Sequence, residues 1–288
     1  MNCILSVIMI TYKHEKFIEQ AVNGVLEQLT DFNFELIIAN DNSPDKTHDV
    51  ITNLLQSHPR GHLVRYLKNP VNLGANLNYI KAYNESLGKY IAVCEGDDIW
   101  KDNLKLQKQV DFLEKYPDYV LTYHDAQCID EDGIKIPNVA NCTPKKELSG
   151  LDLQKGQQPL PLTTCYRKIL KNLPEELVGI TNGDTFLISL LGAHGKGKWL
   201  DVKPAYYRHH IDGVWSLKTK EEKFISKLEI FKSLYTYYRT NGNNDLSLYF
   251  KNEIKHHSKM ILLNELKKGN FKNVLKSSVR LFKVTYYD

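Results

Sequence analysis

Three carboxylates follow one apolar run in this sequence. The run spans residues 89–94, and Glu95, Asp97 and Asp98 come directly after it. Its length and composition are those of a buried strand, so the acids are expected at the strand's carboxyl end. Neighbouring carboxylates repel one another unless a cation or hydrogen-bond donors offset their charge. Such acids can hold Mg²⁺ or Mn²⁺ while a diphosphate supplies the other oxygen ligands.

The alternative is a solvent-exposed loop whose acids cap the next helix. A cap needs only one acid, and Asp102 is better placed for it, because the helix is expected to begin at Asn103. Capping therefore leaves Glu95, Asp97 and Asp98 unexplained. The sequence favours a site for a divalent metal and a diphosphate.

Polar residues also follow the other expected strands of the same sheet. They are Thr11 and Tyr12 after the first strand, Asn40 to Ser43 after the second, and Asn69, Asn72 and Gly74 after the third. Each group alone would be interpreted as a turn. Open α/β sheets bind ligands beyond the carboxyl ends of their strands. Four polar strand ends along one edge therefore indicate a ligand site.

Strands and helices alternate through the first half of the chain. Strands are expected at 4–11, 34–39, 62–67, 89–94 and 119–128, and helices at 15–28, 43–58, 75–87 and 103–115. Ser43 and Pro44 supply an N-cap and a first-turn proline for the second helix. This alternation predicts an α/β fold with a mostly parallel sheet and helices on both faces. Residues 134–160 are irregular and are expected to form an insertion that borders the site.

Two widespread phosphate-binding motifs do not account for the ligand. No Gly-x-Gly-x-x-Gly follows an expected strand. Residues 192–198 match Gly-x-x-x-x-Gly-Lys, but Trp199 replaces the metal-binding Ser or Thr, and a helical run precedes the motif. We expect a turn between a helix and a strand there.

The set of motifs resembles the family 2 glycosyltransferases, which are inverting enzymes with the GT-A fold. The matching segments are 6–12 (SVIMITY), 37–43 (IIANDNS), Asn72 to Gly74 with Asn78, 95–100 (EGDDIW), 182–184 (NGD) and 207–213 (YRHHIDG). The resemblance covers about residues 3–215. It implies a Rossmann-like GT-A domain that transfers a sugar from a nucleotide-sugar donor, and a UDP-sugar is the expected donor. The acceptor would be a glycan or a lipid-linked molecule in cell-surface polysaccharide synthesis.

The resemblance also implies roles for individual residues. The expected donor-nucleotide contacts are Thr11, Tyr12, Asp41, Asn72 and Asp97, the last toward the ribose. Asp98 would be the main ligand of Mn²⁺ or Mg²⁺, with Glu95 and His210 as further metal ligands. This sequence departs from the family pattern at two positions: Asn40-Asp41 stands where the family has an Asp pair, and Glu95 stands where it has the first Asp of the metal motif.

Asp184 is the catalytic base that the resemblance implies. It follows Gly183 and precedes the apolar run 185–191, which places it in a first helical turn. An acid at this point is also favoured by the helix dipole, which is the alternative interpretation. Asp201 and Asp212 are weaker candidates for the base. Arg208 could neutralise phosphate charge or simply stack on the tyrosines that precede it.

The composition is that of an ordinary globular protein, with 42% hydrophobic residues among 288. No apolar run approaches the ~18 residues that span a bilayer, and no basic segment followed by an apolar one begins the chain. The five cysteines form no Cys-x-x-Cys pair. We therefore expect a cytoplasmic protein with reduced thiols.

A change in charge marks a boundary near residue 216. Residues 219–288 carry 14 basic and 7 acidic side chains, whereas the rest of the chain carries 24 and 27. We expect a catalytic domain over 1–215 and a basic helical region over 216–288, with helices at 221–239, 246–267 and 270–283. The last helix is amphipathic and basic. It fits an anionic membrane surface on the inner face of the cell membrane, or packing against the preceding helix or a second subunit.

Two other classes of function stay open. One is a nucleotide-binding module without turnover. The other is an adaptor whose basic tail binds nucleic acid. The second is disfavoured because Lys and Arg are not clustered in the α/β part and no RNA-binding aromatic motif is present. We therefore expect no nucleic-acid partner.

Overall fold

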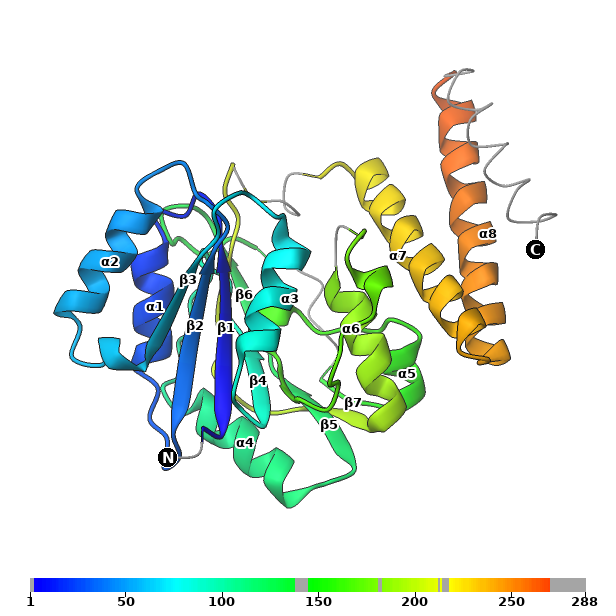
Figure 1. Ribbon diagram of the computed structural model, residues 1–288. Coiled ribbons are helices and arrows are strands. Elements are labelled where there is room, and N and C mark those ends of the chain that lie inside the picture. The colour runs from blue at the N-terminus through cyan, green and yellow to red at the C-terminus, as the bar shows by residue number, and fades with distance from the viewer. Residues whose placement is uncertain (1–2, 138–144, 181–182, 212, 214–217, 270–288) are drawn as a thin grey trace. The chain divides into compact units, whose positions relative to one another are not determined.

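The computed structural model describes residues 3–137, 145–180, 183–211, 213 and 218–269 (Figure 1). The chain divides into two compact units. The first comprises residues 1–173 and 188–213, and the second comprises 174–187 and 214–288. The segment 174–187, which the sequence-based division assigned to the catalytic domain, belongs with the helical unit.

The secondary structure follows the expected alternation of strands and helices. The strands are β1 (Leu5–Thr11), β2 (Phe34–Asn40), β3 (Val64–Lys68), β4 (Tyr90–Val93), β5 (Tyr119–Tyr123), β6 (Ala126–Ile129), β7 (Glu147–Leu148), β8 (Cys165–Arg167), β9 (Lys196–Trp199) and β10 (Ala205–Arg208). The α-helices are α1 (Ile18–Leu26), α2 (Thr47–Ser57), α3 (Ala75–Glu85), α4 (Lys105–Lys115), α5 (Gly150–Gln154), α6 (Gly183–Leu191), α7 (Lys220–Thr240) and α8 (Asn244–Lys267). The 3₁₀ turns are η1 (Gly61–Leu63), η2 (Pro161–Thr163), η3 (Glu175–Leu177) and η4 (Gly192–His194).

A mixed sheet forms the centre of the first unit. Its strand order is β3-β2-β1-β4-β8-β5-β9-β7. The neighbours β3, β2, β1 and β4 are parallel, and so are β5 and β9, whereas β8 and β7 are antiparallel to their neighbours. The prediction of a mostly parallel α/β sheet is confirmed.

Helices cover both faces of this sheet. Side chains of β1 alternate between the two faces, and Leu5, Val7 and Met9 join a buried cluster that includes residues of α1, α2 and α4. Helix α3 packs on β1 and β2 from the other face (Figure 1). Because β1 is covered on both sides, it is apolar nearly throughout, as expected for a central parallel strand.

Two sequence-based boundaries are wrong. Ser43 does not cap α2, which begins at Thr47. Instead the backbone N–H and the hydroxyl of Ser43 both donate to Asn40 Oδ1, and this turn places Asn42 at φ +57°. The predicted strand 119–128 is broken at residues 124–125, because β6 leaves the main sheet and pairs with β10.

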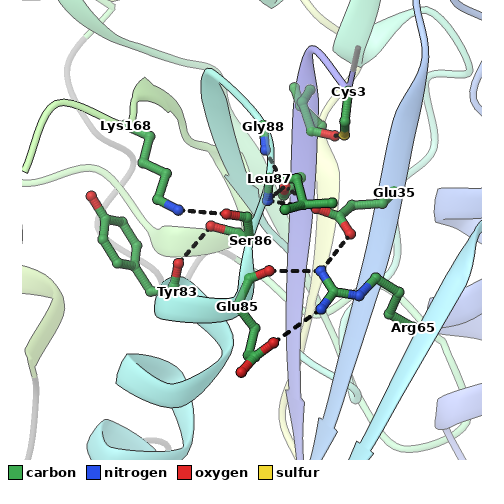
Figure 2. A network of polar contacts seen from close by, with 11 residues as sticks. Cys3, Glu35, Arg65, Tyr83, Glu85, Ser86, Leu87, Gly88 and Lys168 are labelled. Atoms are coloured by element: carbon green, nitrogen blue, oxygen red, sulfur yellow. Dashed lines mark hydrogen bonds and ion pairs between the residues drawn. The ribbon is translucent and has the colours of Figure 1, made fainter. Parts of the chain in front are cut away.

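A polar network fastens the α3–β4 connection to the start of β1 and β2 (Figure 2). Glu35 is buried and accepts hydrogen bonds from Ser6 Oγ (2.6 Å), the Leu87 N–H (2.8 Å) and Arg65 Nη1 (3.0 Å). Gly88 donates its N–H to Ser6 Oγ at 2.8 Å. These contacts hold the start of β4 beside β1, and so fix where the acidic segment emerges at the other end of the strand.

Gly88 must stay without a side chain for this contact to form. A Cβ there would lie 2.4 Å from Ser6 N and 2.6 Å from Leu5 C. We predict that Gly88→Ala lowers the free energy of unfolding by about 1–3 kcal/mol, the usual cost of overpacking. Gly179→Ala, where a Cβ meets nothing within 4 Å, is the matched control. Equal urea midpoints for the two variants would contradict the prediction.

Candidate functional site

The polar strand ends lie at one edge of the sheet. Thr11 at the end of β1 is in register with Asn40 at the end of β2, and Asn40 is in register with Lys68 at the end of β3. Strand β4 runs parallel to β1, and its last residue, Val93, pairs with Ile8. The acidic segment therefore emerges at the same edge, as the sequence predicted.

Glu95, Asp97 and Asp98 converge at this edge. Each offers a carboxylate oxygen within 4.8 Å of the others. Asp98 is 1% exposed, and its Oδ1 accepts a hydrogen bond from the Arg208 N–H at 3.1 Å. Asp97 Oδ1 and Asp98 Oδ2 are buried and have no hydrogen-bond partner among the described residues. Two buried carboxylate oxygens without donors fit a bound cation, because a buried charge needs compensation.

The electrostatics of the two aspartates differ. Burial raises the pKa of Asp98 well above its ordinary value, and the charges of Asp97 and Glu95 raise it further. Burial also acts to raise the pKa of Asp97, but the charge of His14 and the hydrogen bond from His210 outweigh burial, so this pKa is lowered. The Asp98 carboxylate is therefore the one that gains most from a cation, whereas Asp97 already has two histidines beside it.

Asp97 lies between two histidines, of which the sequence analysis identified only one. Asp97 Oδ2 accepts a hydrogen bond from His210 Nε2 at 2.9 Å, and His14 Nε2 lies 3.7 Å from the same oxygen. His14 was not among the predicted site residues, because a single histidine after a strand does not by itself indicate a functional site. Its position two residues after Tyr12, in a predicted ligand loop, was the available clue.

The predicted metal ligands fall into two groups that share Asp97. Glu95 and Asp98 form one group with it, and His210 forms the other together with His14. Gly96 lies between these acids, and a Cβ at this position would come within 2.7 Å of Thr11 Oγ1 and 2.8 Å of His14 Nδ1. The absence of a side chain at Gly96 thus lets the acidic segment approach the β1–α1 loop.

Arg208 is held by the protein itself. Its guanidinium donates to the carbonyl oxygens of Asp97 (3.0 Å), Asp130 (3.2 Å) and Glu131 (2.8 Å) and to Gln20 Oε1 (2.7 Å), and it lies over the ring of Phe17. These contacts favour a role in holding the site together. The phosphate contact predicted for Arg208 stays a prediction.

Asp41 organises the loop that leads into α3. Its carboxylate accepts hydrogen bonds from Asn69 Nδ2 (2.9 Å) and from the N–H groups of Leu73 and Gly74 (both 2.8 Å). Asn72 Nδ2 donates to the Asp41 carbonyl at 3.2 Å. The predicted donor-binding residues Asp41 and Asn72 therefore brace each other, and Gly74, at φ +83°, begins the helix beyond them.

Thr11 and Tyr12, at the end of β1, differ in exposure. Thr11 is buried, and its Oγ1 shares a hydrogen bond of 3.2 Å with His14 Nδ1. The Tyr12 side chain is 40% exposed and offers its ring for stacking. Of these two predicted donor contacts, Tyr12 is the one open to a ligand.

Asp184 lies in the first turn of α6, as predicted. It belongs to the second compact unit, whereas the acidic segment belongs to the first. Its role as base stays a prediction. Asn182 of the same motif and the weaker candidate Asp212 lie outside the described residues.

Buried polar side chains support the segment that follows the acids. Trp100 donates its Nε1–H to the Leu162 carbonyl at 2.8 Å, and Lys105 Nζ lies 4.2 Å from the Trp100 ring centroid. Lys105 Nζ also donates to Gln109 Oε1 at 2.6 Å. Burial lowers the pKa of Lys105 to about 8. Burial, together with the charge of Lys105, lowers the pKa of His124 to about 3.

Comparison with known families accounts for this arrangement. Residues 6–170, more than half of the chain, match the profile described as Glycosyl transferase family 2. The chain belongs to this family, and its fold is of the GT-A type.

Related sequences come from several bacteria. An uncharacterized protein of Mycobacterium tuberculosis is 31% identical over 223 residues, which are 76% of this chain and 63% of that protein. The chain thus spans less than two thirds of that relative's length. TuaG of Bacillus subtilis, whose name connects it with teichuronic acid biosynthesis, is 36% identical over 110 residues, 38% of this chain and 42% of that protein.

Solved structures share the fold at low sequence identity. Staphylococcus aureus TarS, residues 1–349 in complex with UDP-GlcNAc, superposes with a TM-score of 0.60 at 17% identity, covering 99% of this chain and 93% of that one. The mannosyltransferase PcManGT of Pyrobaculum calidifontis, in complex with GDP-Man and Mn²⁺, gives a TM-score of 0.59 at 13% identity, covering 99% and 75%.

The buried ammonium of Lys105 predicts a pH dependence of stability. Its pKa is about 8 in the folded state and near 10.5 in the unfolded state, so between these values the unfolded chain binds more protons and stability rises with pH. Burial of the charged Lys105 ammonium lowers the free energy of unfolding by about 3 kcal/mol, and this full cost applies below pH 8. We expect Lys105→Met to lose this rise between pH 8 and 10.5 in urea denaturation. Lys108→Met, a half-exposed lysine on the same helix, should keep it. The same slope in both variants would contradict the assignment.

Proposed function

We propose that this protein is a metal-dependent, inverting glycosyltransferase whose nucleotide-sugar donor is a UDP-sugar. The observation that carries the proposal is the pair of buried carboxylate oxygens, Asp97 Oδ1 and Asp98 Oδ2, at the carboxyl edge of a parallel sheet. They lie where α/β sheets bind nucleotides, and their charge is not balanced by hydrogen bonds. A divalent cation chelated by a diphosphate would supply that balance.

The acidic group fits Mn²⁺ or Mg²⁺, which prefer oxygen ligands. Asp98 and Glu95 would hold the ion, and Asp97 would lie toward the ribose. A bound ion would stabilise the negative charge that develops on the diphosphate leaving group. The exposed ring of Tyr12 would lie against the base, and the loop braced by Asp41 and Asn72 would form the wall of the nucleotide site.

In this proposal the chemistry is a single displacement. The Asp184 carboxylate takes the proton of the acceptor hydroxyl while that oxygen forms a bond to the anomeric carbon. The bond from the anomeric carbon to the diphosphate breaks at the same time, and its electron pair leaves with the nucleoside diphosphate. Attack from the side opposite the leaving group inverts the anomeric centre. A non-catalytic nucleotide-binding module would bind the donor without this turnover.

The comparisons support this choice of donor and metal. TarS was solved with UDP-GlcNAc, and PcManGT was solved with GDP-Man and Mn²⁺. The connection of TuaG with teichuronic acid supports a cell-surface glycan or a lipid-linked molecule as acceptor. Among the described residues, no helix has the length and apolar character that crossing a bilayer requires. The predicted membrane contact through 270–288 lies outside those residues and, like self-association, stays a hypothesis.

Asp98→Asn tests the metal assignment. We expect turnover to fall by at least about a hundredfold. Without the Asp98 carboxylate the cation binds poorly, and the positive charge that stabilises the diphosphate leaving group is lost. Mn²⁺ should also no longer increase the affinity for UDP-sugar measured by titration calorimetry. The exposed turn residue Asp132, changed to Asn, is the matched control. Full metal-dependent hydrolysis of UDP-sugars by Asp98→Asn would refute the assignment.

Asp184→Asn tests the base. We expect kcat to fall by about 10²- to 10⁴-fold with donor affinity nearly unchanged, since a general base acts on the transition state. Asp245→Asn is a matched control, because Asp245 also lies in the first turn of a helix of the second unit. Both variants should show a similar small decrease in the free energy of unfolding, because each loses the favourable interaction between a first-turn carboxylate and the helix dipole. If Asp184→Asn loses only stability, Asp184 is a helix-start acid and not the base.

A further inference from the structure

An open cavity lies along helix α4, within the first compact unit. Its volume is about 410 Å³, and sites for small ligands usually measure about 300–1,000 Å³. One wall is the segment 200–202, which follows β9. The other wall is a stripe of residues three or four positions apart, which places them on one face of the helix. The stripe consists of Lys108, Asp111, Phe112, Lys115 and Tyr116.

An exposed aromatic ring forms the apolar part of this cavity. Tyr116 is 40% exposed, and the centroid of its ring lies 4.6 Å from that of Phe112. Phe112 in turn packs edge to face on Tyr119, with centroids 5.0 Å apart. The Tyr116 ring is therefore held by neighbouring rings while part of its surface stays open to a ligand.

Charged groups of both signs accompany this ring. Lys108 and Lys115 supply two ammonium groups, and Asp111 and Asp201 supply two carboxylates. Lys115 Nζ lies 5.4 Å from the centroid of the Tyr116 ring. Lys115 and Asp201 form no hydrogen bond or ion pair with the described part of the chain, so both are available to a ligand. The cavity thus offers donors and acceptors without a net charge.

This combination distinguishes between classes of ligand. Nucleic acids and other polyanions need a basic surface, whereas two cations and two anions balance here. The core of a protein interface is depleted of charged residues, whereas four of the eight residues that line this cavity are charged. A neutral sugar has hydroxyl groups that both donate and accept, and C–H groups that pack on the face of an aromatic ring. The cavity therefore fits a neutral saccharide.

Asp102 joins the two walls of the cavity near the acidic segment. Its Oδ2 forms an ion pair with Lys108 Nζ at 2.8 Å and accepts a hydrogen bond from the Lys203 N–H at 3.1 Å. Asp102 stands four residues after Asp98 in the chain. Helix α4 leads from the carboxyl edge of the sheet back to the start of β5, so the Lys108 end of the cavity is the end nearer this edge.

We propose that this cavity binds a neutral oligosaccharide and holds the part of a glycan acceptor that is remote from the reacting hydroxyl. Tyr116 packs on a sugar ring, and Lys115 and Asp201 form hydrogen bonds with its hydroxyl groups. The role in holding an acceptor rests on the proposed function, whereas saccharide binding itself does not. A second contact of this kind favours long acceptors over short ones, because both contacts act on one molecule.

Carbene footprinting locates the saccharide on the wild-type protein. The full chain is labelled with and without cellotetraose, maltotetraose or N-acetylchitotetraose, and mass spectrometry identifies the labelled residues. We expect at least one of these neutral tetrasaccharides to protect residues 108–116 and 200–202. Asp98→Asn should show the same protection. Turnover without protection would count against this cavity, and protection without turnover would count against the proposed function.

Tyr116→Ala tests the contact with the ring. We expect the Kd of the protecting saccharide, measured by titration calorimetry, to rise at least about fivefold, because packing on the ring is lost. Asp201→Asn should raise this Kd at least about threefold, because a charge-assisted hydrogen bond is weakened. Two matched controls change residues that do not line the cavity: Tyr235→Ala on α7 and Asp132→Asn in an exposed turn. Both should leave the Kd unchanged.

Four outcomes would overturn the proposal. The first is that none of the three neutral tetrasaccharides protects the cavity, a result that needs no variant and so does not depend on the folding of Tyr116→Ala. The second is an unchanged Kd in both Tyr116→Ala and Asp201→Asn. The third is protection by a heparin tetrasaccharide alone, which would show an anion site. The fourth is a dimer in sedimentation that Tyr116→Ala dissociates, which would show a subunit interface.

Discussion

Repulsion among Glu95, Asp97 and Asp98 is the constraint that the rest of the site has to balance. Part of the balance comes from the segment 206–210: Tyr206 pairs with Ile99, Arg208 donates its N–H to Asp98, and His210 donates to Asp97. The compensation is incomplete at Asp98, whose pKa stays raised because burial and two neighbouring charges act together. An incompletely balanced buried carboxylate is where a cation gains most.

Buried contacts at both ends of β4 hold the segment that carries the three acids. Behind the acids, Lys105 packs against Trp100, which also donates to the Leu162 carbonyl. At the other end of β4, Glu35 and Ser6 hold the chain that enters the strand. The cost of burying Lys105 is consistent with a protein that gives up stability to position a functional segment.

Several polar residues of the predicted donor site form hydrogen bonds within the protein itself. The Asp41 carboxylate accepts three hydrogen bonds that hold the loop before α3. The Arg208 guanidinium donates to backbone carbonyl oxygens and to the side chain of Gln20. Such residues preorganise a binding site, since groups already held in place lose less entropy when a ligand arrives. Tyr12, with its exposed ring, is placed differently and can contact a ligand directly.

The sequence by itself determined the α/β class, the mostly parallel sheet, the acids at the end of β4 and the helical turn of Asp184. These features depend on periodicity and on neighbouring residues, which are local properties of a chain. Tertiary structure decided the pairing of His14 with His210, the internal use of Arg208, the break after Tyr123 and the place of 174–187 in the helical unit. Each of these depends on which distant surfaces pack together, and one sequence carries no local signal for such contacts.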